Sequence, residues 1–177
     1  MKRNMWIKRF FPYIALLLFI PWPVAYATST DVIAGEDAVR IEIAEPSARP
    51  SYTAFGRAIG GVSNPGALFY VDATNSPSDI QVTLYLTNAQ QLIRYYRYLI
   101  LDVGIYIENG EGEWERAVTS NGEPVPKTII SMRNGQVSFL LPGSSRYRVT
   151  IDGGCFYCTR AAADSYSLSP QFCLEAN

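Results

Sequence analysis

Three cysteines near the end of the chain are the residues most able to do chemistry. Cys155 and Cys158 form a C-x-x-C pattern, and Cys173 follows alone. In a reducing compartment this pattern indicates a zinc site or a redox enzyme, whereas in an oxidising compartment it more often indicates a disulfide. A thioredoxin-type pair also needs alternating strands and helices around it, which this sequence lacks. We therefore predict a structural Cys155–Cys158 disulfide, with Cys158–Cys173 or Cys155–Cys173 as the alternative pairings.

The preferred pairing depends on the strands expected around the cysteines. Residues Arg146–Ile151 and Tyr166–Leu174 both have strand-like patterns, and pairing them as a hairpin places C-x-x-C in the connecting loop. Cys173 would then lie roughly 20 Å away along the returning strand, at ~3.3 Å per residue. A bridge needs Cα atoms within about 7 Å. The expected hairpin therefore leaves Cys173 buried or free.

Histidine is absent from the whole chain, which excludes several kinds of catalytic site. Without imidazole there is no Ser-His-Asp triad and no Cys-His pair. Hydrolytic zinc sites also lose their usual nitrogen ligands. We therefore predict no bound metal, no cofactor and no enzymatic activity, and keep a thiol- or carboxylate-dependent secreted enzyme as an alternative.

The carboxylates suggest no specific site. Residues Glu108–Glu115 include four glutamates, but their spacing fits no calcium-binding loop, and a solvated hairpin tip explains them equally well. Asp102 interrupts an apolar run and shares a strand face with Tyr98, Gly104 and Tyr106. No second carboxylate can be paired with it for glycoside hydrolysis. We expect Asp102 to be an exposed or edge-facing polar residue.

An aromatic and basic run is the best candidate for ligand binding. It consists of Arg94, Tyr95, Tyr96, Arg97 and Tyr98. Tyrosine rings can stack on sugars, and tyrosine and arginine are enriched at protein interfaces. The interpretation we favour, however, is that two of the three tyrosines simply cover the core between strands. We predict a protein or a glycan at the cell surface as the partner of this run.

The N-terminus has the features of an export signal. Residues 1–27 begin with basic residues, continue with the apolar run Phe10–Ile20 and end on the small-x-small pattern of Ala25 and Ala27. The apolar run is much shorter than the ~20 residues that span a membrane. We expect a signal helix that is cleaved before Thr28, and a secreted, periplasmic or cell-surface protein. An uncleaved segment would instead tether the protein to the membrane.

Removal of this segment makes the chain acidic. The full sequence of 177 residues carries 15 basic and 16 acidic residues. Four of the basic residues and none of the acidic ones lie in 1–27, which leaves 11 basic against 16 acidic residues, a formal charge of −5. Nucleic-acid binders carry the opposite excess, because they neutralise phosphates, so this class is excluded.

Short strands separated by turns dominate the rest of the sequence. Ile80–Leu86 has the clearest alternation of apolar and polar residues. Asn109-Gly110 and Asn134-Gly135 predict two hairpin turns, the second joining 128–132 to 136–141. The segment 88–94 predicts one helical turn with Asn88 as its N-cap. The glycine-rich segment 51–66 is expected to be a surface loop, with at most a short strand at 52–55.

These patterns together predict an all-β fold. We expect a flexible arm over 28–37 and a single domain over 38–177, an antiparallel β-sandwich of immunoglobulin-like or jelly-roll type. The predicted function is an exported, non-enzymatic structural or binding module. A secreted carbohydrate-binding module that uses exposed tyrosines is the alternative. Self-association through the arm or through an edge strand is a further expectation.

Overall fold

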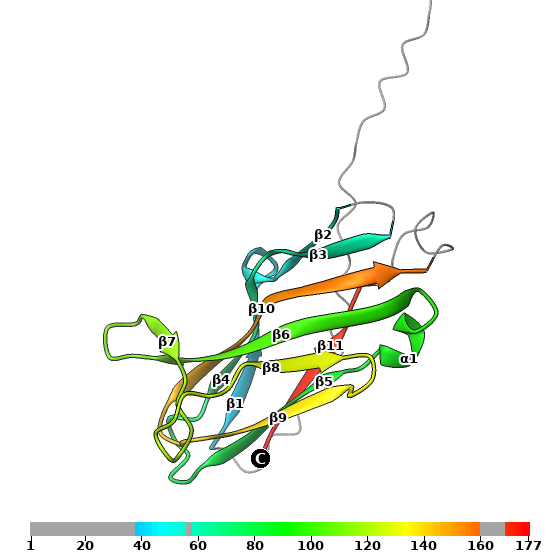
Figure 1. The fold of residues 1–177 in the computed structure, drawn as a ribbon. Coiled ribbons are helices and arrows are strands. Elements are labelled where there is room, and N and C mark those ends of the chain that lie inside the picture. The colour runs from blue at the N-terminus through cyan, green and yellow to red at the C-terminus, as the bar shows by residue number, and fades with distance from the viewer. Residues whose placement is uncertain (1–37, 56–57, 160–168) are drawn as a thin grey trace, which may run out of the picture.

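The computed structural model describes residues 38–55, 58–159 and 169–177, which fold mainly into β-strands (Figure 1). The predicted signal segment 1–27, its cleavage site and the arm 28–37 lie outside the described residues. Within the described ranges, no helix has the length and hydropathy that crossing a membrane requires.

The described strands form two sheets in which every pairing is antiparallel, which confirms the all-β prediction. The larger sheet contains β1 (Arg40–Ile43), β2 (Ser51–Ala54), β3 (Ile59–Asn64), β4 (Gly66–Asp72), β6 (Tyr96–Glu108), β7 (Trp114–Arg116), β8 (Thr128–Ser131) and β10 (Arg146–Cys158). The smaller sheet contains β5 (Ile80–Leu86), β9 (Gln136–Leu141) and β11 (Phe172–Ala176). Two short helical turns complete the described elements, η1 (Pro46–Ala48) and α1 (Ala89–Leu92).

Strand β10 is the centre of the larger sheet. One of its edges pairs with β4 along its first half and with β3 near its end, while its other edge pairs with β6. The register shifts between Ile151 and Gly153, which is a β-bulge. Because the bulge changes the alternation of faces, Ile151 and Phe156 both point into the core although they are five residues apart.

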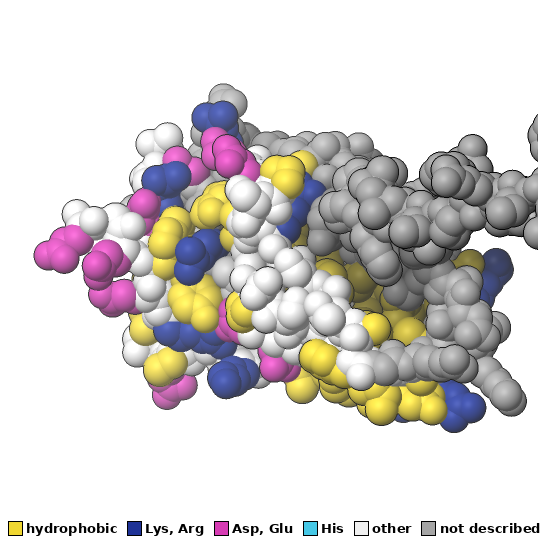
Figure 2. All heavy atoms as spheres, turned by 90° about the horizontal axis from the view of Figure 1, so that it is seen from above, with side chains coloured by type: hydrophobic (Ala, Val, Ile, Leu, Met, Phe, Trp, Pro, Cys, Tyr) yellow, Lys and Arg dark blue, Asp and Glu magenta, His cyan; other side chains and the backbone are white. Residues whose placement is uncertain are grey.

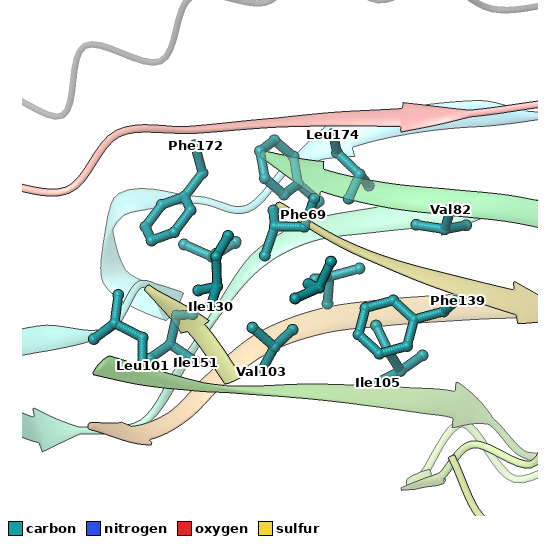
Figure 3. Packing of buried hydrophobic residues seen from close by; sticks show 14 of the residues in the cluster. Phe69, Val82, Leu101, Val103, Ile105, Ile130, Phe139, Ile151, Phe172 and Leu174 are labelled. Atoms are coloured by element: carbon teal, nitrogen blue, oxygen red, sulfur yellow. The ribbon is translucent and has the colours of Figure 1, made fainter. Parts of the chain in front are cut away.

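The two sheets face each other across one hydrophobic core (Figure 3). Strand β6 directs every second side chain inward, and the same alternation operates in β5 and β9. Burial of each large aliphatic side chain contributes about 1.5–3 kcal/mol relative to exposure. The core residues labelled in Figure 3 are Phe69, Val82, Leu101, Val103, Ile105, Ile130, Phe139, Ile151, Phe172 and Leu174.

The prediction of a loop over 51–66 is wrong except for the short strand expected at 52–55, which is present as β2; the segment also forms β3 and the start of β4. Thr53 pairs with Gly61 across the two strands. The glycines mark close packing here rather than a loop. A Cβ atom at Gly60 would lie 2.0 Å from the ring of Phe156, so only glycine leaves room for that buried ring.

Of the two predicted hairpin turns, one is confirmed. Strands β6 and β7 pair on either side of Asn109-Gly110. At Asn134-Gly135, by contrast, β8 pairs with β6 and β9 pairs with β5, so the turn carries the chain from one sheet to the other. The Asn134 side chain holds this turn by accepting from Ser131 N at 2.6 Å and donating to Ile129 O at 2.8 Å.

The hairpin expected around the C-x-x-C pattern does not form. Strand β10 continues through both cysteines, and β11 pairs with β5 in the smaller sheet. Part of the expected second strand, 166–168, lies outside the described residues. The helical turn at α1 is present, but Asn88 makes no side-chain cap bond. Its amide instead bonds to Ser169 O and Gln171 N, at 2.9 and 3.0 Å, and thereby fixes the entry into β11.

Candidate functional site

The outer face of the larger sheet carries an exposed apolar surface. Because β6 sends Leu99 and Leu101 inward, it sends Tyr98 and Ile100 outward, as the alternation predicted. Neighbouring strands add side chains at paired positions: Tyr157 lies between Ile59 and Tyr98, and Cys155 lies between Gly61 and Ile100. We call this surface the apolar patch; its members are Phe55, Ile59, Tyr98, Ile100, Ile129, Cys155 and Tyr157.

Exposure of the patch is high for such large side chains. The exposed fraction is 71% for Phe55, 51% for Ile59 and 49% for Ile129. It is 42% for Tyr98 and 36% for Ile100. Contiguous exposed apolar surfaces are uncommon on soluble proteins and mark interaction sites.

The predicted binding run is divided between this surface and the core. Tyr98 stacks on Tyr157 with ring centroids 6.1 Å apart and an interplanar angle of 22°. The Arg97 guanidinium lies 5.5 Å from the centre of the same Tyr157 ring. Tyr96, however, is only 5% exposed and packs edge-on against Phe156 in the core.

The other two members of the run take intermediate roles. Tyr95 is partly buried against the core, and Arg94 is exposed beside α1. The structure therefore brings only Arg97 and Tyr98 to the apolar patch. Sequence reasoning missed Ile59 and Tyr157, because it assigned both to loops. The apolar residues on either side of Gly60-Gly61, Ile59 and Val62, were a signal that could have found Ile59.

The predicted Cys155–Cys158 disulfide does not form. Residues three apart on one strand point to opposite faces and lie about 10 Å apart, beyond the ~7 Å that a bridge tolerates. Cys155 is accordingly exposed and Cys158 buried. Cys173 lies in the other sheet, opposite Tyr85, so neither alternative pairing forms. Burial raises the pKa of the Cys158 thiol, which opposes thiolate chemistry.

A polar network occupies the same sheet face beyond the patch. Arg116 forms an ion pair with Asp152 at 2.8 Å, and the Tyr106 hydroxyl donates to Asp152 at 3.0 Å. Thr150 also donates to this carboxylate. Gly104 lies directly beneath it, since a Cβ atom there would be 2.2 Å from the Asp152 oxygen. Desolvation, followed by the hydrogen bond to Asp152, raises the pKa of the Tyr106 hydroxyl.

An arginine–aromatic stack continues this network. The Arg148 guanidinium lies 5.2 Å from the ring centre of Tyr106 and 4.9 Å from that of Trp114. Trp114 in turn lies 5.7 Å from Tyr70. Figure 2 shows basic and hydrophobic side chains interleaved next to the acidic end of the molecule. We interpret this stack as a structural contact that stabilises the packing of β4, β10, β6 and β7 against one another.

The described residues offer no other obvious chemical centre. They contain no group of three or more His, Cys, Asp or Glu side chains placed to hold a metal ion. In the glutamate-rich hairpin, Glu108 pairs with Arg146 at 2.8 Å, and Asn109 accepts from the backbone of Glu111 and Glu113. A cavity of about 80 Å³ near Tyr96 and Pro170 is far smaller than a typical ligand pocket.

No known protein family model matches the chain, and no similar sequence was found among curated proteins. The interpretation of the site therefore rests on its own geometry.

Proposed function

We propose that the chain is an exported, non-enzymatic β-sandwich that acts as a structural or binding module at the cell surface, through the apolar patch. The observation that carries this proposal is the exposure of Ile59, Tyr98, Ile100 and Ile129 on one sheet face. Aromatic side chains beside an arginine, with few acidic residues, are the composition of an interface centre. The sequence of residues 1–27 supports export.

The proposal is tested by following the full chain, with a C-terminal tag, in the cells that make it. We expect the mature protein to begin at Thr28, to lie outside the cytoplasm and to remain cell-associated after washing. The double substitution Ile59→Asp and Ile129→Asp should release it. Leu140→Asp is the matched control, because Leu140 is 53% exposed but lies on the other sheet. A cytoplasmic protein that keeps residues 1–27, or equal retention of both variants, would contradict the proposal.

Carbohydrate binding is the second candidate, and a specific contact favours it. Tyr98 and Tyr157 present two nearly parallel rings on the surface, with Arg97 beside them as a hydrogen-bond donor. A glycan array should then show binding that Tyr98→Ala removes and Tyr85→Ala retains, since Tyr85 lies on the other sheet. An array with no signal for the unaltered chain would reject this candidate.

A further inference from the structure

We propose that the apolar patch is the contact surface of a symmetric homodimer, in which two copies pack the outer faces of their larger sheets together. This inference rests on the proposed function and names its partner, a second copy of this chain. It differs from pairing of edge strands, because side chains and not backbone groups would make the contact.

The arrangement of the patch is self-complementary about Cys155. Cys155 and Ile100 form its central row, since they are paired residues on β10 and β6. On β6, Tyr98 lies two residues before Ile100 and Asp102 lies two residues after it. Asp102 pairs with Ile129 of β8. A two-fold axis across the strands at the central row therefore places Tyr98 of one copy over Asp102 of the other.

This symmetry also brings opposite charges together. Arg97 lies against Tyr157, which is paired with Tyr98, and so belongs to the Tyr98 end of the patch. In the part of the chain that the structure describes, neither Arg97 nor Asp102 has an ion-pair partner. The two-fold axis places the Arg97 of each copy near the Asp102 of the other. Two equivalent ion pairs would then flank an apolar centre, which is the usual anatomy of an interface.

The proposed contact predicts the distance between the Cys155 residues of the two copies. Sheets that pack face to face lie about 10 Å apart. The two Cys155 residues would face each other at the centre, too far apart for a disulfide, which needs Cα atoms within about 7 Å. A short bismaleimide can span this gap. We therefore expect the reagent to join two copies through Cys155, with no disulfide-linked dimer forming under oxidation.

Sedimentation equilibrium of the purified full chain tests the proposal. We expect the mass of two chains, falling to one on dilution. Ile129→Asp should raise the dissociation constant at least tenfold, about 1.4 kcal/mol, whereas Leu140→Asp should leave it unchanged. Arg97→Asp and Asp102→Arg should each weaken the dimer, and the two together should restore it. This rescue separates a lost contact from a misfolded variant, and near-UV circular dichroism checks the fold of each variant.

Several results would overturn the homodimer. One is a single-chain mass for the unaltered protein at every concentration; another is failure of the charge swap to restore association. The homodimer would also be overturned if Ile129→Asp did not weaken association, or if the bismaleimide still linked two copies of the Cys155→Ser variant. If the unaltered protein is monomeric but the patch still retains it on cells, the partner is another molecule, and the proposed function stands without this inference.

Discussion

Replacing Gly104 with alanine tests how the outer face of β6 holds the Asp152 carboxylate. A Cβ atom at position 104 would lie 2.2 Å from one carboxylate oxygen and 2.6 Å from the other, far inside van der Waals contact. The carboxylate would have to move, and it accepts from both Arg116 and Tyr106. A single methyl group therefore disturbs the whole polar network.

The expected cost combines two opposing effects. Overpacking and displaced partners destabilise by about 1–3 kcal/mol, while alanine restricts the unfolded chain and recovers about 0.4–1 kcal/mol. The side chains of Arg116 and Asp152 are 27% and 26% exposed, so water partly screens their ion pair. We expect Gly104→Ala to lower the free energy of unfolding by about 1–2 kcal/mol.

A double-mutant cycle in urea measures whether this cost comes from Asp152. Asp152→Ala alone should cost about 2 kcal/mol, because it leaves the Arg116 and Tyr106 donors without their acceptor. In that background the space above Gly104 is empty, so Gly104→Ala should be neutral or slightly stabilising. The coupling energy should then be about 1–2 kcal/mol. Gly110→Ala is the matched control, since a Cβ atom there meets nothing within 4 Å. An equal cost of Gly104→Ala in both backgrounds would refute the reasoning.

Three further predictions concern other parts of the fold. Tyr147 is fully buried, its hydroxyl donates to Pro142 O, and burial raises its pKa. Since the unfolded phenol ionises near pH 10 and the folded one only above that, the free energy of unfolding should fall as the pH rises beyond about 10. Tyr147→Phe should reduce this pH dependence in urea titrations, at a cost of about 1 kcal/mol at neutral pH. An unchanged pH dependence in the variant would show that Tyr147 is not its source. At a dilution where the protein is a single chain, thiol labelling of the folded protein should modify Cys155 fast and Cys158 slowly; a Cys155–Cys158-linked peptide in the mass spectrum would contradict the strand geometry. Asn134→Ala should cost about 1–2 kcal/mol in thermal or urea unfolding by removing the bonds to Ser131 and Ile129, and an unchanged midpoint would show that they do not hold the turn.

Local alternation predicted the faces of the strands but not their partners. Ile80–Leu86 and the outward positions of Tyr98 and Asp102 follow from side-chain spacing alone, which is a property of a few neighbouring residues. Asn109-Gly110 and Asn134-Gly135 show the limit of this reasoning. Both dipeptides reverse the chain, but only the first joins two strands that pair with each other. The hydrogen bonds that distinguish them involve residues far away in the sequence.

The site was less predictable than the fold, because its residues come from glycine-containing segments. A glycine in a sequence can indicate either a loop or a strand position where another group packs closely. Gly60 suggested a loop, whereas the structure uses it for close packing against Phe156. The strand that begins at Arg146 was expected to end at Ile151, whereas β10 continues to Cys158. Once β3 and β10 were not expected at these positions, Ile59 and Tyr157 could not be placed beside Tyr98. The same omission led to the wrong disulfide prediction, since it placed Cys155 and Cys158 in a loop.

The central position of β10 has a consequence for the order in which the protein can fold. Local pairs such as β2–β3 and β6–β7 can form as soon as their residues have been synthesised. Among the described strands, however, only β10 joins β4, β3 and β6 to one another. Because synthesis runs from the N-terminus, most of the chain emerges before this strand does. The larger sheet must therefore remain open until late in synthesis. A chain that is threaded unfolded through a translocation channel would benefit from this delay, since it cannot close its core before most of it has passed.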